Sequence, residues 1–329
     1  MFYIGLDLAW ASNRQTGIAV IDSSGNLLKL TAVRTNDEVE AVLRPFISDP
    51  CRVAIDAPLV VNNESGARPC ELALNKDFRP FDAVAQSSSR RNPWFRPRPR
   101  GTILAEQLGF DIDPKSAAPR RAIEVYPHPA IVVIFGLPRI IKYKDRSPKG
   151  QKPRELSEMR TELQQLTHLI ETKLGDHDVA LRVDGHPDWA RLDSDIRLAP
   201  TKAALNRAAD EVDAVVCAYV ARYADLKSED VVMYGDIDHG YIVTPKLPPG
   251  LKAGEPALAV CRGVEIDSEA GLLDHAVATC RHELALLETA ASDVAGVSAG
   301  GVSAAANEVG RATESLREAR RRLKMKPGG

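Results

Sequence analysis

Three strand-like segments open the chain, and the connections between them are too short for a crossover. The segments are residues 2–8, 17–22 and 27–33, and the last two flank a turn of sequence SSGN. Their apolar and β-branched residues favour strands. Because parallel neighbours need a connection of a dozen or more residues, the three strands are expected to form an antiparallel meander.

A helix and then another strand follow the meander. Asn36 is a suitable helix cap, and Val39, Val42 and Leu43 recur at helical spacing. The next segment, residues 52–59 (RVAIDAPL), is almost entirely apolar, which is typical of a central parallel strand. The order strand-strand-strand-helix-strand therefore predicts an α/β protein with a mixed sheet.

The same patterns place the later elements. Residues 122–126 (AIEVY) resemble a strand that ends before a proline, and residues 240–245 resemble a final strand. Helical spacing of apolar residues predicts two amphipathic helices, over residues 155–174 and 201–224. Residues 184–198 are polar, and we predict them to be irregular.

Shifts in composition predict a core domain with two additions. Residues 62–120 are rich in proline and contain a Ser- and Arg-rich tract, so we interpret them as a loop insertion. Around this insertion, residues 1–248 are expected to form one domain. Ala, Gly and Ser are abundant near the C-terminus, and residues 249–329 are predicted to be a helical or partly disordered extension.

Charge and cysteine content narrow the class of protein. The 329-residue chain has a net charge of −2, so any contact with nucleic acid must use a local basic patch. Its five cysteines are scattered without a C-x-x-C pair, which argues against structural zinc and a disulfide framework. No run of about 18 apolar residues and no signal-peptide pattern occurs, so we expect a cytoplasmic protein without membrane contact.

Two acids stand inside strand-like apolar segments. Leu6 and Leu8 flank Asp7, and Asp56 lies within AIDAPL. An ionised carboxylate in such a place is unfavourable unless a cation or hydrogen-bond donors satisfy it. If the two strands are neighbours, their carboxylates repel each other, and a divalent ion removes that repulsion. Taken singly, each acid has a plainer explanation as a turn former or a helix-capping partner.

A second pair of acids lies on the predicted helix 201–224. Asp210 and Asp213 are three residues apart and so share one face, among valines that indicate inward packing. An acid pair on a helix is more often solvated, but here two strand acids precede it in the chain. Oxygen ligands in this number suit Mg²⁺ or Mn²⁺ better than zinc. Two such ions about 4 Å apart can activate a water and stabilise the leaving oxygen of a phosphodiester.

Five motifs occur together in one order along the chain. They are GLDLAW (5–10), AIDAPL (54–59), GARPCE (66–71), EVYPH (124–128) and DEVDAVVCAY (210–219). Over about residues 1–245 the chain thereby resembles an uncharacterised family of predicted RNase H-like nucleases, the domain-of-unknown-function 429 group. The D-x-x-D-A helix motif is also similar to that of RuvC-type junction resolvases.

The resemblance implies an RNase H-like fold with a five-stranded mixed sheet, metal between its first and fourth strands, and further carboxylates from a later helix. Carried over position by position, the catalytic and metal-binding residues would be Asp7, Asp56, Asp210 and Asp213, with Mg²⁺ or Mn²⁺ as the cofactor. The implied activity is two-metal hydrolysis of a phosphodiester. The implied partner is nucleic acid or another phosphodiester.

Other polar residues are candidates around these acids. Glu124 is either a further catalytic acid or an ion-pair partner of Arg68 or Arg121. Arg68 and Glu71, from GARPCE, are expected to reach the site from the insertion, with Arg68 as a substrate contact. His128 is either a proton relay or simply a hydrogen-bonded residue at a strand end.

The tract of arginines and aromatic residues at positions 90–100 (RRNPWFRPRPR) is the candidate nucleic-acid contact. Arg96 can pair with phosphate, and Trp94 or Phe95 can stack on an unpaired base. The alternative is a solvated loop whose aromatic residues pack on the body of the protein. The remaining candidates for contact with phosphate or with an attacking water are Lys142, Lys144 and Lys202.

Two other classes of function stay open. An actin-like ATPase or phosphotransferase shares the strand-strand-strand-helix-strand order, but it needs two such halves with glycine-rich phosphate loops, and here LAWA follows Asp7. The other alternative is a non-catalytic nucleic-acid-binding module. The four acids argue against it, because an inactive site has no use for unfavourable buried charge.

Overall fold

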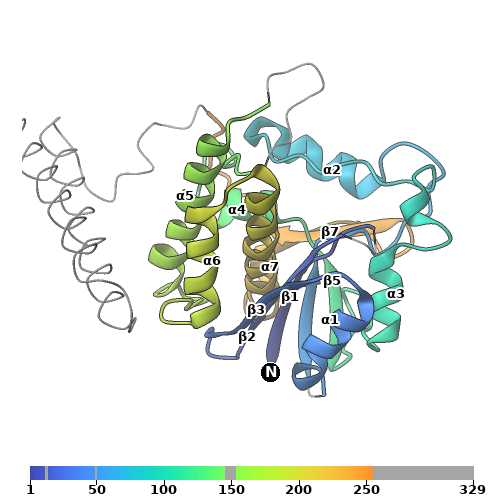
Figure 1. Ribbon diagram of the computed structural model, residues 1–329. Helices are drawn as coiled ribbons and strands as arrows, with labels where there is room; N and C mark the ends of the chain where they lie inside the picture. Colours follow the sequence, from blue (N-terminus) through green and yellow to red (C-terminus); the bar gives the residue numbers. More distant parts are fainter. Residues whose placement is uncertain (12–13, 49, 145–152, 255–329) are drawn as a thin grey trace, which may run out of the picture. The chain divides into compact units, whose positions relative to one another are not determined.

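One mixed five-stranded sheet organises the molecule. The computed structural model of the chain describes residues 1–254 except 12–13, 49 and 145–152. The strand order is β3-β2-β1-β4-β5 (Figure 1). The strands are β1 (Phe2–Asp7), β2 (Thr16–Ile21), β3 (Leu27–Val33), β4 (Cys51–Ile55) and β5 (Arg120–Glu124). β1, β2 and β3 pair antiparallel, whereas β4 pairs parallel with β1 and β5. The predicted meander and mixed sheet are confirmed.

Helices cover both faces of this sheet. The long helix α7 (Lys202–Leu226) packs on β1, β2 and β4, with α6 (Pro187–Leu198) and α5 (Leu156–Leu174) beyond it. In Figure 1 the short helices α1 (Asn36–Leu43) and α3 (Arg100–Gln107) lie on the opposite side from α7. The cap of α1 is Thr35 rather than Asn36, because the Thr35 hydroxyl accepts from the Glu38 N–H in a capping box.

Helix α7 touches the sheet through backbone rather than side chains at two glycines. A Cβ added to Gly5 in β1 would lie 2.0 Å from the carbonyl oxygen of Ala214, and one added to Gly17 in β2 would lie 2.1 Å from that of Asp210. No real side chain fits at such distances. The absence of side chains at these two positions therefore sets how closely α7 approaches β1 and β2.

The proline-rich segment 62–120 contains helices instead of forming the predicted loop. It holds α2 (Pro69–Phe78) and α3, with the 3-10 turns η2 (Arg79–Phe81) and η3 (Pro93–Phe95). Several of its prolines start helices: Pro69 and Pro93 occupy the first turn, where a missing N–H is tolerated. Helix α2 buries Cys70, Leu74 and Phe78. Helix boundaries, rather than loop structure, thus explain these prolines.

Two further predictions are corrected by the structure. Residues 184–198, predicted to be irregular, contain α6, which buries Trp189, Leu192 and Ile196 at helical spacing among charged residues. The predicted strand at Gly240–Pro245 is β7, and it pairs antiparallel with β6 (Val231–Asp236), which the sequence analysis did not identify. This hairpin forms a separate two-stranded sheet that packs on α2.

The remaining elements are short. Helix α4 (Pro127–Ile134) follows β5, and the 3-10 turns η1 (Arg44–Phe46) and η4 (Ser228–Asp230) follow α1 and α7. The three cysteines within the described residues are free thiols and buried. In the described part of the chain, no helix is long and apolar enough to cross a membrane. Apart from residues 249–254, the predicted C-terminal extension lies outside the described residues.

Candidate functional site

Three acids stand at one end of the parallel strands. Asp7 is the last residue of β1, Asp56 directly follows β4, and Glu124 is the last residue of β5. The N–H of Asp56 donates to the Leu6 carbonyl at 2.8 Å, which fixes the two strand ends side by side. β1 and β4 are parallel neighbours, which is the condition under which the sequence analysis expected Asp7 and Asp56 to lie close together.

Helix α7 adds two more acids to this edge. Asp210 and Asp213 lie on the face of α7 that packs against the sheet, and Asp213 is 1% exposed. The contact between Gly17 and the Asp210 carbonyl holds this turn of the helix against β2. Carboxylates from β1, from the end of β4 and from α7 are thereby brought together, which is the joint pattern seen in the sequence.

Lys144 lies at the point where three of these carboxylates meet. Its Nζ is 3.0 Å from Asp7 Oδ2, 2.9 Å from Asp210 Oδ1 and 2.6 Å from Asp213 Oδ2. The lysine side chain is 13% exposed, so the contacts are largely shielded from water. The cluster therefore contains its own positive charge, on a residue predicted from the sequence to contact phosphate.

Burial and mutual repulsion shift the pKa values in this cluster. Burial raises the pKa of Asp7 well above its ordinary value; Lys144 opposes this shift, and Asp210, Asp213 and Asp56 add to it. The pKa of Asp210 is also raised by burial, with partial relief from Lys144. Burial alone would lower the pKa of Lys144, but attraction to Asp213, Asp7 and Asp210 outweighs it and raises that pKa. Lys144 is therefore an ammonium ion at neutral pH.

A row of three rings, linked by a ring contact and a hydrogen bond, lies beside Asp213. The Tyr143 hydroxyl donates to Asp213 Oδ1 at 2.5 Å, and the Tyr143 ring makes an edge contact with His128 at 5.8 Å. His128 in turn shares a hydrogen bond of 3.0 Å between its Nδ1 and the Tyr126 hydroxyl. The row runs from Asp213 to Tyr126, and Tyr126 lines the adjoining cavity.

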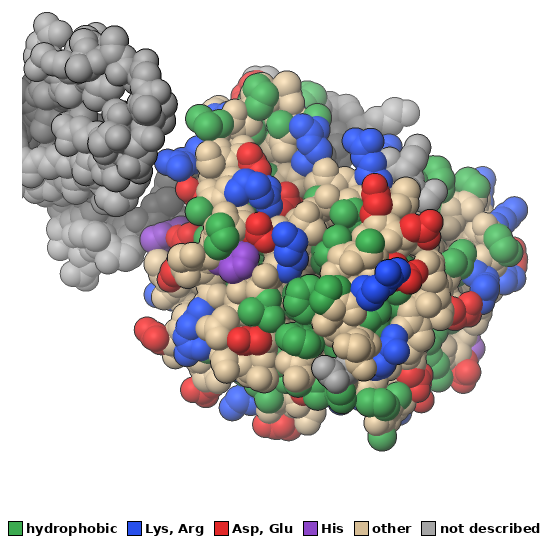
Figure 2. Space-filling model, turned by 60° about the horizontal axis from the view of Figure 1, so that its bottom comes forward, with side chains coloured by type: hydrophobic (Ala, Val, Ile, Leu, Met, Phe, Trp, Pro, Cys, Tyr) green, Lys and Arg blue, Asp and Glu red, His purple; other side chains and the backbone are tan. Residues whose placement is uncertain are grey.

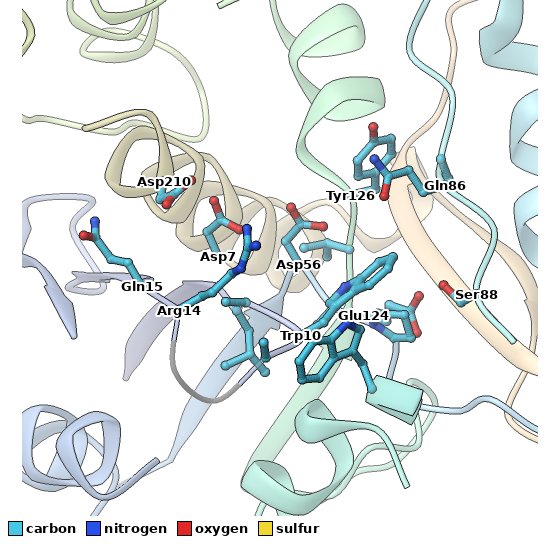
Figure 3. Close-up of a pocket in the computed structure, with 18 of the residues that line it drawn as sticks. Asp7, Trp10, Arg14, Gln15, Asp56, Gln86, Ser88, Glu124, Tyr126 and Asp210 are labelled. Atoms are coloured by element: carbon cyan, nitrogen blue, oxygen red, sulfur yellow. The ribbon is translucent and has the colours of Figure 1, made fainter. Parts of the chain in front are cut away.

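The acids open onto a cavity of about 840 Å³. In Figure 3 the carboxylates of Asp7 and Asp56 point into the same space, with Asp210 above them on α7 and Trp10 opposite. The wall is mixed in character. Its acids are Asp7, Asp56, Glu71, Glu124 and Asp210; its bases include Arg14, Arg34, Lys144 and Arg207; its indoles are Trp10 and Trp94.

Glu124 and Arg68 form an ion pair at the floor of this cavity. The Arg68 guanidinium donates to Glu124 at 2.5 and 3.0 Å, to Glu71 Oε1 at 2.8 Å and to the Val60 carbonyl at 3.0 Å. Arg68 is 2% exposed. The ion pair that the sequence analysis left open for Glu124 is thus present, and it ties the segment of α2 to β5. The Arg68 guanidinium, predicted from the sequence to contact substrate, therefore donates to these protein groups.

Only some of the other predicted substrate contacts lie at the cavity. Trp94 lines the cavity and is 50% exposed, whereas Phe95 is buried and packs on Trp10 with ring centroids 4.8 Å apart. The lining does not include Arg96, Lys142 or Lys202. Lys142 Nζ pairs with Asp82 Oδ2 at 2.8 Å, and Arg96 donates to the Arg90 carbonyl.

The cavity residues that were not identified from the sequence include Trp10, Arg14 and Arg207. Trp10 lies within the GLDLAW motif, so its proximity to Asp7 was a usable signal. Arg207 lies three residues before Asp210 on the same helix, where helical spacing predicts a shared face. No sequence pattern places Arg14 in the cavity.

The donor chemistry of the cluster suits a hard cation, but its geometry is built around a lysine. Carboxylate oxygens are the ligands that Mg²⁺ and Mn²⁺ take. Within the described residues, however, no group of three or more His, Cys, Asp or Glu side chains is arranged to hold a metal ion. The point where Asp7, Asp210 and Asp213 converge is the position of the Lys144 ammonium. These carboxylates are the type of ligand that such an ion takes, but an ion can occupy this point only if Lys144 moves away.

On the face of the molecule seen in Figure 2, acidic and basic side chains alternate and do not gather by sign. This agrees with the net charge of −2.

Comparison with known proteins gives one match. A family model described as "Protein of unknown function (DUF429)" matches residues 5–238, which is well over half of the chain and spans every candidate site residue. No curated protein and no solved structure matches it.

Proposed function

The chain belongs to the DUF429 family, and we propose that it is a metal-dependent phosphodiester hydrolase, most simply a nuclease. The order of strands and the acids at the ends of β1 and β4 also support an RNase H-like assignment of the fold. The single observation that carries the proposal is the convergence of three carboxylates, one from β1 and two from α7, on one cationic atom at the edge of a cavity.

Buried acids gathered in this way favour a cation-binding role. Four carboxylates repel one another, and folding them together is unfavourable unless positive charge is present. Asp7, Asp56 and Asp210 line the cavity and would hold Mg²⁺ or Mn²⁺, with Asp213 behind them. When bound, such ions supply an activated water and charge stabilisation for a leaving phosphate oxygen.

The remaining wall of the cavity suits a nucleotide. Arg14 and Arg207 are exposed there and can attract a phosphate group. Trp10 and Trp94 offer aromatic surface on which an unpaired base can stack. A volume of about 840 Å³ lies within the range of small-molecule sites. The substrate class supported best is therefore an unpaired strand end or a small phosphodiester, in preference to an intact duplex.

The test combines metal binding with hydrolysis. Thermal unfolding of chelator-treated protein should shift upward on addition of Mg²⁺ or Mn²⁺, because a ligand of the folded state stabilises it by mass action. The same metal should support hydrolysis of single-stranded DNA, of RNA or of bis(p-nitrophenyl) phosphate. Asp56→Asn should lose both effects, whereas Asp37→Asn, on the exposed face of α1, should keep both. Metal binding without hydrolysis of any of these substrates would contradict the proposed hydrolase activity.

One observation favours a second candidate, a binding module without catalysis. Lys144 already balances part of the negative charge, so the acids do not by themselves require a metal. Such a module would bind single-stranded nucleic acid equally well with and without Mg²⁺, and would leave it intact. The actin-like alternative gains no support, because the described residues contain one strand-strand-strand-helix-strand unit and no second copy.

A further inference from the structure

We propose that Lys144 is a built-in competitor of the metal, whose ammonium must leave the carboxylates before a divalent cation can bind there. This inference rests on the proposed function, since it assumes that the acids bind a cation. It adds a regulated step to that site: the cluster alternates between a lysine-paired state and a metal-loaded state.

The ammonium contacts three carboxylates at once. An ammonium has three N–H donors. Lys144 Nζ donates to Asp7 Oδ2 at 3.0 Å and to Asp210 Oδ1 at 2.9 Å, and it lies 2.6 Å from Asp213 Oδ2 as an ion pair. The lysine therefore acts on the whole cluster, in contrast to a surface ion pair with one partner.

A metal ion and the ammonium cannot share this position. Mg²⁺ binds carboxylate oxygens at about 2.0–2.1 Å and Ca²⁺ at about 2.3–2.6 Å. An ion held by Asp7 and Asp210 through the oxygens that Nζ now contacts would lie close to Nζ, and the two positive charges would repel in a poorly hydrated site. Occupation by one therefore excludes the other.

The structure provides a way for the ammonium to leave. Tyr143, the preceding residue, is 1% exposed and is held by its hydrogen bond to Asp213, so the backbone next to the site is anchored. Lys144 itself lines the cavity, and its flexible four-carbon side chain can turn into that space. There the released ammonium joins Arg14 and Arg207 as a positive charge available to an anionic substrate.

The first experiment measures Mn²⁺ binding to the full-length protein from the loss of the free-ion electron paramagnetic resonance signal. Lys144→Met removes the competitor and should tighten Mn²⁺ binding by about tenfold or more, the scale of one close charge pair. Lys142→Met is the matched control. It removes a lysine two residues away that pairs with Asp82 outside the cavity, and it should bind Mn²⁺ as the wild type does.

The outcomes separate the two proposals. Tighter Mn²⁺ binding by Lys144→Met, together with unchanged Mn²⁺ binding by Lys142→Met, supports the competition. Equal Mn²⁺ affinity of the wild type and Lys144→Met overturns the competition but keeps the metal site of the proposed function. Absence of Mn²⁺ binding by both at millimolar metal overturns both.

A second experiment uses the wild type, so it does not depend on a variant that folds. Brief acetylation with and without Mn²⁺, read by mass spectrometry, reports how accessible each lysine amine is. Labelling of Lys144 should rise several-fold when Mn²⁺ binds, whereas labelling of Lys142 should not change. Unchanged labelling of Lys144 in protein that has demonstrably bound Mn²⁺ would overturn the competition.

Discussion

At the scale of single residues, Lys144 changes how the acids are interpreted. The sequence shows acids in apolar surroundings and so indicates that some positive charge must be near. It does not show whether that charge is an ion or a side chain, because Lys144 lies more than 60 residues from the nearest of its partners in the chain. Only the fold brings it to the cluster.

Asp7 gives a prediction for pH dependence. Burial raises its pKa well above the ordinary value of 3.8; Lys144 opposes the shift and the other acids add to it. The folded protein therefore keeps a proton at pH values where the unfolded chain has lost it, and metal-free wild type loses stability as the pH rises above about 4. Asp7→Asn removes this loss. Urea unfolding in chelator should show the variant's advantage in unfolding free energy growing as the pH rises above about 4. An advantage that does not change with pH would contradict the shift.

The Arg68–Glu124 pair gives a prediction for stability. Both side chains are buried, so Arg68→Met leaves Glu71 and Glu124 without their cation. Breaking a buried pair in this way costs about 3–5 kcal/mol of unfolding free energy. Denaturant unfolding measures this loss. The double variant Arg68→Met/Glu124→Met should recover part of it, and a double variant as unstable as the sum of its single changes would show that the pair is not coupled.

At the scale of elements, α7 determines where the helix acids stand. Its sequence predicted both the helix and the shared face of Asp210 and Asp213, because a long stretch of helical spacing is a strong signal. Helices α2 and α6 were not predicted. Prolines around α2 were interpreted as loop residues, since a proline at a helix start and a proline in a loop look the same in sequence. The many charged residues of α6 were interpreted as irregular structure. The order of the acids in the chain was therefore predictable, whereas helices α2 and α6 were not.

Gly17→Ala tests the contact between α7 and β2. The added methyl group would lie 2.1 Å from the Asp210 carbonyl oxygen, so the helix must move and carry Asp210 with it. We expect a loss of about 1–3 kcal/mol in unfolding free energy, as for other overpacked sites, together with weaker Mn²⁺ binding. Gly175→Ala is the control, because its nearest atom would be 3.7 Å away. A Gly17→Ala protein with normal Mn²⁺ affinity would argue against this role of the contact.

At the scale of the whole molecule, residues Met1–Pro256 form one compact unit. The five-stranded sheet, its helices and the β6–β7 hairpin all lie within it, as does the whole cavity lining. From shifts in composition along the chain, the sequence analysis expected a domain over residues 1–248.

We therefore expect a chain that ends at Gly254 to fold and to keep the site. Circular dichroism during urea unfolding should show one cooperative transition, as for a single domain. Its midpoint and its shift with Mn²⁺ should match those of the full-length protein. A truncated chain that stays unfolded, or that loses the Mn²⁺ shift, would mean that residues beyond 254 contribute to the unit.

The backbone contact at Gly5 and Gly17 restricts how related sequences can diverge. Substitutions on the surface of α7 leave the acids in place, whereas a side chain at either glycine forces the helix away from the sheet together with Asp210 and Asp213. The glycines and the helix acids should therefore be inherited as one unit. Lineages in which another residue has replaced either glycine should also have lost the acids, and an alignment of the family can be searched for exceptions.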